Sequence, residues 1–141
     1  MLFRESTYIK GRVDGLIKTY WPDGKVKAEN IFKMGKPSIG LKEYEKDGKT
    51  LVIQPSIVIL HLPSVKNTFK VCLSDGSTDV DFYLEDLEDG KYFNPKTHSL
   101  RFEDGVAILK NPRHVSNKIC IIAKVKTKYG NTLILQKYID L

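Results

Sequence analysis

The chain has 141 residues, of which 41% are hydrophobic and 28% are charged. This balance is typical of a folded domain and excludes a disordered chain. The longest apolar run, residues 56–62, is too short to cross a bilayer, so no transmembrane segment is expected. The first residues also lack the basic and apolar stretches of a signal peptide, and removal of one from a longer precursor is left open.

The net charge of +6 is unevenly distributed along the chain. Residues 1–54 carry 11 basic and 7 acidic side chains, residues 55–104 carry 5 and 9, and residues 105–141 carry 7 and 1. Basic ends alone do not indicate nucleic-acid binding, and no nucleic-acid recognition motif accompanies them. We therefore expect no nucleic-acid partner.

An internal repeat with an offset of 24 residues runs through the first third of the chain. The matching pairs are Tyr8 and Phe32, Gly11 and Gly35, Arg12 and Lys36, Tyr20 and Tyr44, Asp23 and Asp47, Gly24 and Gly48, and Lys25 and Lys49. Glycine and Asp-Gly favour tight turns, so each repeat is predicted to be a β-hairpin. The glycines expected in structural roles are Gly11, Gly15, Gly24, Gly35, Gly40 and Gly48, where Gly15 matches Gly40 one residue out of step.

The strings GLIKTYWPDGKVKAENIFKMGK and GLKEYEKDGKT resemble variant MORN repeats, with a glycine, a tyrosine and a terminal Asn/Asp-Gly-Lys. The resemblance covers residues 8–52 and implies a β-hairpin sheet with a binding or scaffolding role. In bacteria, such variants occur in proteins often identified as antitoxins of toxin–antitoxin pairs and in envelope-associated proteins. It therefore implies an unidentified protein partner and favours the cell envelope or export over the cytoplasm, with an antitoxin as the alternative.

Aromatic and lysine side chains are interleaved along the repeat and form the candidate binding face. They are Tyr8, Tyr20, Trp21, Phe32 and Tyr44, with Lys18, Lys25 and Lys42. Such a face suits a protein segment and, as a second alternative, an acidic membrane surface. The competing interpretation is structural, because a single-layer sheet must bury one of its faces and aromatic residues serve that purpose.

After Gln54 the 24-residue period ends, and Pro55 marks the boundary between a domain of residues 1–54 and one of residues 55–141. Seven short strands are predicted in the second domain, at residues 57–62, 68–74, 80–85, 99–102, 106–110, 118–128 and 132–139. Their number and spacing predict an immunoglobulin-like or fibronectin-like β-sandwich. The whole chain is therefore expected to be all-β. For the last two strands, alternation favours a three-residue turn at 129–131 that pairs Val125 with Leu135.

The sequence contains no pattern typical of an enzyme, a metal site or a cofactor site, so a non-catalytic protein without cofactors is expected. The histidines His61, His98 and His114 have spacings that suit neither a metal site nor a catalytic triad. The acidic stretch Asp75–Asp89 lacks the EF-hand spacing, and its carboxylates are expected to line a strand and its turns, with calcium binding left open.

The two cysteines, Cys72 and Cys120, are not arranged as metal ligands. Cys72 alternates with the apolar residues of its predicted strand, and Cys120 shares its strand face with lysines. Both are therefore predicted to be free thiols.

Overall fold

The computed structural model describes residues 4–9, 11–62, 64, 68–100, 102–110 and 118–140. Regular structure in these residues consists of twelve β-strands and no helix, which confirms the all-β prediction. The described residues contain no helix that is long and apolar enough to cross a membrane. The chain divides into two compact units, Met1–Gln54 with Glu88–Asn94 and Pro55–Leu87 with Pro95–Leu141. The return of Glu88–Asn94 to the first unit was not expected from the sequence.

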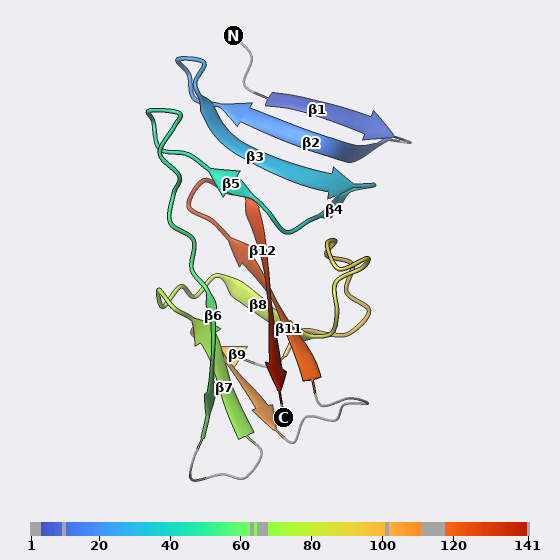
Figure 1. The fold of residues 1–141 in the computed structure, drawn as a ribbon, viewed down its shortest axis with the longest axis vertical. Coiled ribbons are helices and arrows are strands. Elements are labelled where there is room, and N and C mark those ends of the chain that lie inside the picture. Colours follow the sequence, from blue (N-terminus) through green and yellow to red (C-terminus); the bar gives the residue numbers. More distant parts are fainter. Residues whose placement is uncertain are drawn as a thin grey trace. The chain divides into compact units, whose positions relative to one another are not determined.

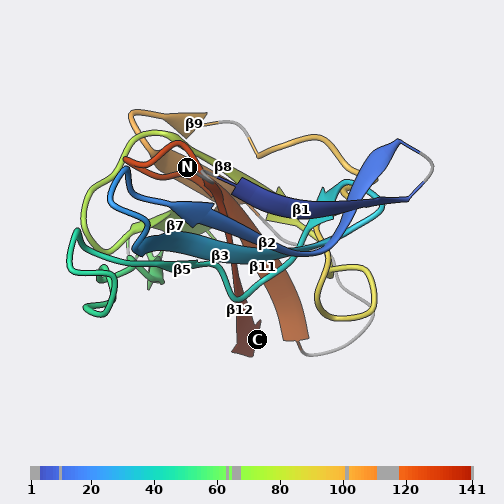
Figure 2. The same cartoon turned by 90° about the horizontal axis from the view of Figure 1, so that it is seen from above.

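The first unit is an antiparallel sheet built from β-hairpins (Figures 1 and 2). Its strands are β1 (Arg4–Ile9), β2 (Arg12–Tyr20), β3 (Val26–Lys33), β4 (Lys36–Pro37) and β5 (Lys42–Glu43). The strands β1, β2 and β3 lie side by side in that order, and β3 pairs along its other edge with both β4 and β5. Together, β4 and β5 act as one interrupted strand.

Strand pairing in the first unit recurs with the same 24-residue offset as the sequence repeat. In the first hairpin, the pairs are Arg4 with Thr19, Glu5 with Lys18, Tyr8 with Val13 and Ile9 with Arg12. In the second, they are Ala28 with Glu43, Glu29 with Lys42, Phe32 with Pro37 and Lys33 with Lys36. All four pairs move by 24 residues on both strands, so each repeat unit is one hairpin with a fixed register.

The turns after β2 and β5 also repeat. Asp23 Oδ1 accepts a hydrogen bond from the Lys25 amide at 3.0 Å, and Asp47 Oδ1 accepts one from the Lys49 amide at 2.8 Å. An aspartate that binds an amide two residues ahead fixes a turn, which explains why Asp-Gly-Lys recurs. Asp47 also accepts hydrogen bonds from the hydroxyl and amide of Thr50, and these bonds lower the pKa of Asp47 to about 2.

The two repeated turns are in contact with each other. The Trp21 indole N–H donates to the Glu45 carbonyl at 3.0 Å, and these two residues are 24 positions apart. The Lys27 ammonium lies 4.9 Å from the centroid of the Trp21 ring. A Cβ added to Gly48 would lie only 2.8 Å from the Cβ of Lys25. Successive repeats are therefore stacked turn on turn.

The tight turn between β3 and β4 is attached to β2. Met34 and Gly35 have φ values of 49° and 83°, and two consecutive positive φ angles are typical of a type I′ hairpin turn. The Met34 amide donates to Asp14 Oδ1 at 2.9 Å, and the Gly35 amide donates to the Val13 carbonyl at 2.7 Å. These bonds fix the second hairpin against the first.

The second unit contains two antiparallel sheets (Figure 1). The first has the order β6 (Ile57–His61), β7 (Thr68–Leu73), β10 (Val106–Lys110) and β9 (Phe102–Glu103), and the second has the order β12 (Thr132–Asp140), β11 (Lys118–Lys126) and β8 (Val80–Leu84). The second unit thus has one sheet of four strands and one of three, which is compatible with the predicted β-sandwich. Every predicted strand overlaps an observed one.

Alternate side chains of the two sheets form the core of the second unit. Val71 and Ala107 are neighbours across β7 and β10, and both are fully buried. Phe82 and Ala123 are neighbours across β8 and β11 and are buried to the same degree. Burying a side chain of the size of Phe82 stabilises a fold by roughly 1.5–3 kcal/mol.

The β11–β12 hairpin has a different register from the predicted one. Val125 pairs with Leu133 and not with Leu135. The loop does have three residues, but they are residues 128–130. A three-residue hairpin loop ends in a residue with positive φ, and Gly130, with φ of 84°, takes that position. Because the shift is two residues, the inward and outward faces of both strands are unchanged.

Cys120 lies on the strand face shared with lysines, but it is buried there. Cys120 and Ile122 are 6% and 1% exposed, whereas Lys124 and Lys126 on the same face are exposed. Burial raises the pKa of the Cys120 thiol to about 11, so the thiol is protonated at neutral pH. Both Cys72 and Cys120 are free thiols, in agreement with the prediction.

Gly48→Ala should destabilise the first unit more than Gly24→Ala, although the two glycines are equivalent in the repeat. Both have positive φ, where alanine costs about 1–2 kcal/mol. Only at Gly48 must the added Cβ also displace Lys25, because nothing lies within 4 Å at Gly24. Urea unfolding followed by fluorescence of Trp21, the only tryptophan, measures both losses. Equal losses would contradict turn-on-turn stacking.

Candidate functional site

Sheets take up partners at their edges, because an edge strand presents backbone N–H and C=O groups that no neighbour has paired. The hairpin sheet has one edge along β1 and the other along β4 and β5. These edges differ in whether the chain's own residues cover them, and an edge that they leave uncovered is a candidate binding site.

Residues 50–52 cover the outer edge of β5. The Val52 amide donates to the Glu43 carbonyl at 2.8 Å. This pair stands 24 residues after the pair formed by Ala28 and Thr19 on β3 and β2. Residues 50–52 thus begin the strand of a third repeat, which stops at the boundary with the second unit.

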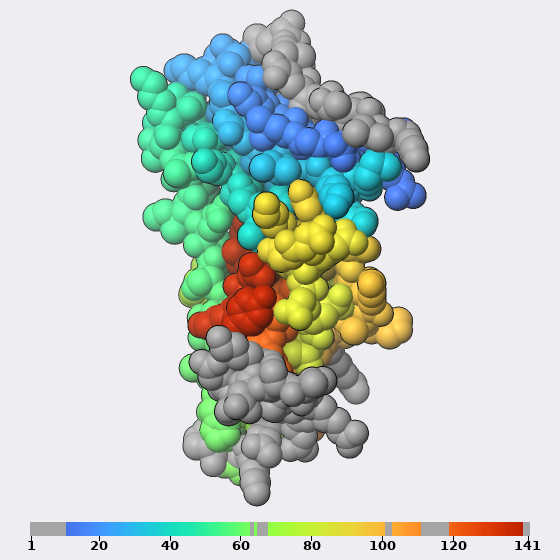
Figure 3. Space-filling view, turned by 45° about the vertical axis from the view of Figure 1, so that its right-hand side comes forward, coloured from blue at the N-terminus to red at the C-terminus, as the bar shows by residue number. Residues whose placement is uncertain are grey.

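Glu88–Asn94, here termed the capping segment, covers the edge that begins at β4. Its antiparallel contacts are a hydrogen bond from the Ile39 amide to the Lys91 carbonyl at 2.9 Å, one from the Phe93 amide to the Pro37 carbonyl at 2.7 Å, and a bridge between Ser38 and Tyr92. In Figure 3 the yellow surface of this segment lies against the cyan surface around β4. The capping segment takes the place that the rest of a third repeat strand would occupy.

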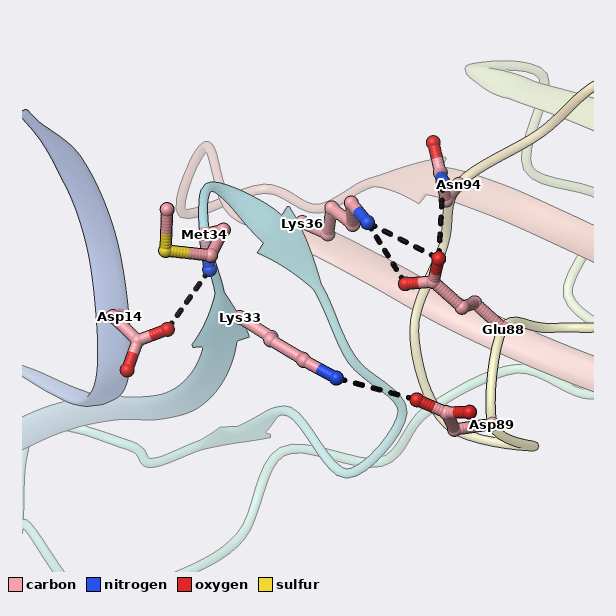
Figure 4. Close-up of polar contacts among 7 residues, drawn as sticks. All are labelled: Asp14, Lys33, Met34, Lys36, Glu88, Asp89 and Asn94. Atoms are coloured by element: carbon pink, nitrogen blue, oxygen red, sulfur yellow. Dashed lines mark hydrogen bonds and ion pairs between the residues drawn. The ribbon is translucent and has the colours of Figure 1, made fainter. Parts of the chain in front are cut away.

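Two ion pairs hold the capping segment (Figure 4). Lys36 Nζ lies 2.9 Å from Glu88 Oε2, and Lys33 Nζ lies 3.3 Å from Asp89 Oδ2. The hydrogen bonds from Lys36 and then from Asn94 lower the pKa of Glu88, and the bond to Asp89 raises the pKa of Lys33. Solvent reaches all four charged groups, so these pairs orient the segment more than they stabilise it.

The edge along β1 is open in the part of the chain that the structure describes. There, β1 pairs only with β2. By contrast β3, which stands 24 residues later in the repeat, is paired along both edges. The sheet is therefore closed at one end by its own chain and open at the other.

The aromatic residues predicted to bind a ligand lie in several different settings. Trp21 joins the two stacked turns through its bond to Glu45, and Tyr20 and Tyr44 are half-buried at the ends of their strands. Phe32 is half-buried and alternates in step with Asn30 and Ala28, which are buried. The side chain of Tyr8 lies outside the described part of the structure. Four of these five rings are thus half-buried in the sheet or its turns.

The lysines predicted to bind a ligand are split between a turn and a sheet face. Lys25 is exposed in the turn after β2, 3.9 Å from Asp23. Lys18 and Lys42 lie on the more exposed face of the sheet, where Glu29 pairs with both of them across β2, β3 and β5. This row alternates in charge, so it lacks the continuous positive surface that an anionic membrane attracts.

The six glycines expected in structural roles all have positive φ, as tight turns and irregular strand positions require. The values are 76° for Gly11, 82° for Gly15, 90° for Gly24, 83° for Gly35, 96° for Gly40 and 69° for Gly48. Gly15 and Gly40, which are one residue out of step in the sequence, both lie where a ladder changes register. The one-residue slip therefore falls in an irregular stretch.

The carboxylates of the acidic stretch Asp75–Asp89 are engaged locally. Asp75 accepts a hydrogen bond from the Ser77 amide, and Glu85 accepts bonds from the amide and hydroxyl of Thr97. Glu88 and Asp89 bind the lysines of the hairpin sheet. Among the described residues, no three potential metal ligands come together.

The histidines that the structure describes are on the surface. His61 packs edge-on against Phe69 with ring centroids 5.2 Å apart, and His98 is exposed. His114 lies outside the described residues.

The capping segment was not predicted, because it lies between two strands assigned to the sandwich. One local signal was present, because Asp89-Gly90-Lys91 is a third copy of the Asp-Gly-Lys found in both repeat turns. It lies out of phase with the 24-residue period. The turn motif alone, without the period, is therefore the signal that points to this segment.

Comparisons of the chain with protein-family models, curated proteins and solved structures found no match.

Protonating Glu88 should loosen the capping segment. Its pKa in the folded protein is below the ordinary value of 4.5, so its stabilising effect is complete above pH 4.5 and is lost as the pH falls through the lowered pKa. We expect hydrogen exchange at the Ile39 and Phe93 amides, corrected for intrinsic rate, to accelerate in that acidic range. Glu88→Gln should exchange faster at neutral pH and lack the acid step, whereas Glu103→Gln, at an exposed carboxylate outside the capping segment, should behave as the wild type. Wild-type protection in Glu88→Gln would contradict the role of the ion pair.

Proposed function

We propose that this protein is a non-catalytic binding module that takes up an extended segment of a protein partner along the outer edge of β1. The observation that supports this most directly is the asymmetry of the hairpin sheet. The edge of β4 and β5 is covered by residues 50–52 and by the capping segment, whereas β1 pairs only with β2 among the described residues. Main-chain hydrogen bonds to such an edge provide affinity for a strand of suitable length.

The repeat architecture supports the same proposal. Proteins built from stacked repeats bury each unit against its neighbours and need shielded units at their ends. Among the residues that the structure describes, such a shield is present at the β4–β5 end only. We include the assignment of the repeat to the MORN type in this proposal, because the pairing recurs at the same offset as the sequence motif.

Proline substitutions in β1 test the proposed edge. Successive amides of a strand point to opposite edges, so Thr7→Pro and Tyr8→Pro remove one amide that faces β2 and one that faces outward. The variant that loses the outward-facing amide is here termed the outward variant. It should keep the wild-type unfolding midpoint, measured by Trp21 fluorescence, because no hydrogen bond within the sheet is lost. The immobilised wild-type chain is used to capture a partner from an extract of its native cells. The outward variant should capture about tenfold less of that partner, or less still.

Two further measurements separate this edge from the rest of the surface. Hydrogen exchange of the complex should show new protection at the amides of Arg4–Ile9. Glu88→Gln, which loosens the opposite edge, should capture the same amount of partner as the wild type. Full capture by both proline variants, or new protection confined to the capping segment, would contradict the proposal.

A further inference from the structure

We infer that the segment taken up along β1 is β1 of a second copy of this chain, so that two hairpin sheets join into one continuous antiparallel sheet. This inference rests on the proposed function, because it assigns an occupant to the same edge.

The edges of the hairpin sheet restrict how two copies can combine. In a second copy, the far edge of β5 is already paired with residues 50–52, and Pro37–Ile39 are paired with the capping segment. Of the described strands in this sheet, β1 alone has an outer edge to offer. Two sheets of this kind can therefore extend one another only by placing β1 against β1.

Pairing β1 with itself is compatible with a closed dimer. A two-fold axis perpendicular to a sheet relates an edge strand to an antiparallel copy of itself, so both partners use the same surface. Joining consumes the open edge of each copy. Both outer ends of the joined sheet are then the ends that the capping segment covers, and assembly stops at two copies.

Charge and strand geometry limit the register of this pairing. Residues directly opposite each other share a sheet face, so the two-fold axis must pass through a residue position and not between two positions. Centring on Arg4 or Glu5 would place identical charges opposite each other, which is destabilising. Centring on Ser6 pairs Arg4 with Tyr8 and Glu5 with Thr7, and centring on Thr7 leaves Ser6 two positions from its copy. Centring on Tyr8 or Ile9 would overlap no more of each β1 than Thr7–Ile9, so the registers centred on Ser6 and Thr7 give the longest pairing without identical charges opposite each other. In both of these registers Ser6 lies near the axis.

The second unit has a competing surface for self-association. Leu60 and Ile108 are 51% and 40% exposed. Lys70 on β7 pairs with Leu60 on β6 and with Ile108 on β10, so it lies between them on the same face of the sheet. This apolar face is interrupted by a charge, and a second copy would place another lysine close to it. We therefore favour the β1 edge and treat this face as an alternative for the experiment to exclude.

Opposite charges introduced near the axis test the inference on the full chain. In a dilution series followed by analytical ultracentrifugation, the wild type should be a reversible dimer. Ser6→Asp alone and Ser6→Lys alone should each weaken the dimer by about tenfold or more, because each brings like charges together. An equimolar mixture of the two variants should recover wild-type affinity as a mixed dimer. Ser99→Asp and Ser99→Lys, at an exposed serine outside the hairpin sheet, make the same charge changes and should leave the dimer unaffected.

Each other result overturns the inference in a distinguishable way. In one such result, the wild type stays monomeric while the outward proline variant in β1 still loses its captured partner. This result overturns the second copy as occupant and leaves the proposed function standing. A dimer that resists both Ser6 variants but dissociates with Leu60→Lys places self-association on the second unit. If neither dimer nor partner capture responds to changes in β1, both proposals fail.

Discussion

The pairing of β3 on both of its edges is the interaction on which the first unit depends. One edge holds β2 and the other holds β4 and β5, so β3 joins the two repeats into a single sheet. Because each hairpin offers its successor the same register, the structure has no internal reason to stop at two units. What ends it is a covering of the last edge, and the chain supplies that covering from residues well outside the repeat.

This arrangement moves attention from the faces of the hairpin sheet to its edges. Among the aromatic residues of the predicted binding face, Trp21 joins the two stacked turns through Glu45, and Tyr20, Phe32 and Tyr44 are half-buried. The lysines on the exposed face alternate with Glu29. The two ends of the sheet differ in whether the backbone N–H and C=O groups of the edge strand are paired by other described residues. No residue type reveals this difference.

Local signals made much of the fold predictable. Asp23 and Asp47 fix their turns through amides two residues ahead, so the turn chemistry and the period can be seen in the sequence. Alternation helped to locate strands such as β8, in which Val80 and Phe82 are buried and Asp81 and Tyr83 between and after them are not. The register at Gly130 was missed because it depends on which loop position takes positive φ. The burial of Cys120 and the capping segment depend on contacts between distant parts of the chain, which periodicity does not encode.

The late position of the capping segment also has a consequence for biosynthesis. A ribosome completes both hairpins well before it reaches Glu88, so during that interval the edge beside Pro37–Ile39 lacks the capping segment that later pairs with it. Closing this edge requires the growing sandwich to deliver a loop back to a unit made earlier, which links the maturation of the two units in time. A chain interrupted after residue 54 would retain both hairpins and lack that protection, and uncovered strand edges of this kind promote aggregation.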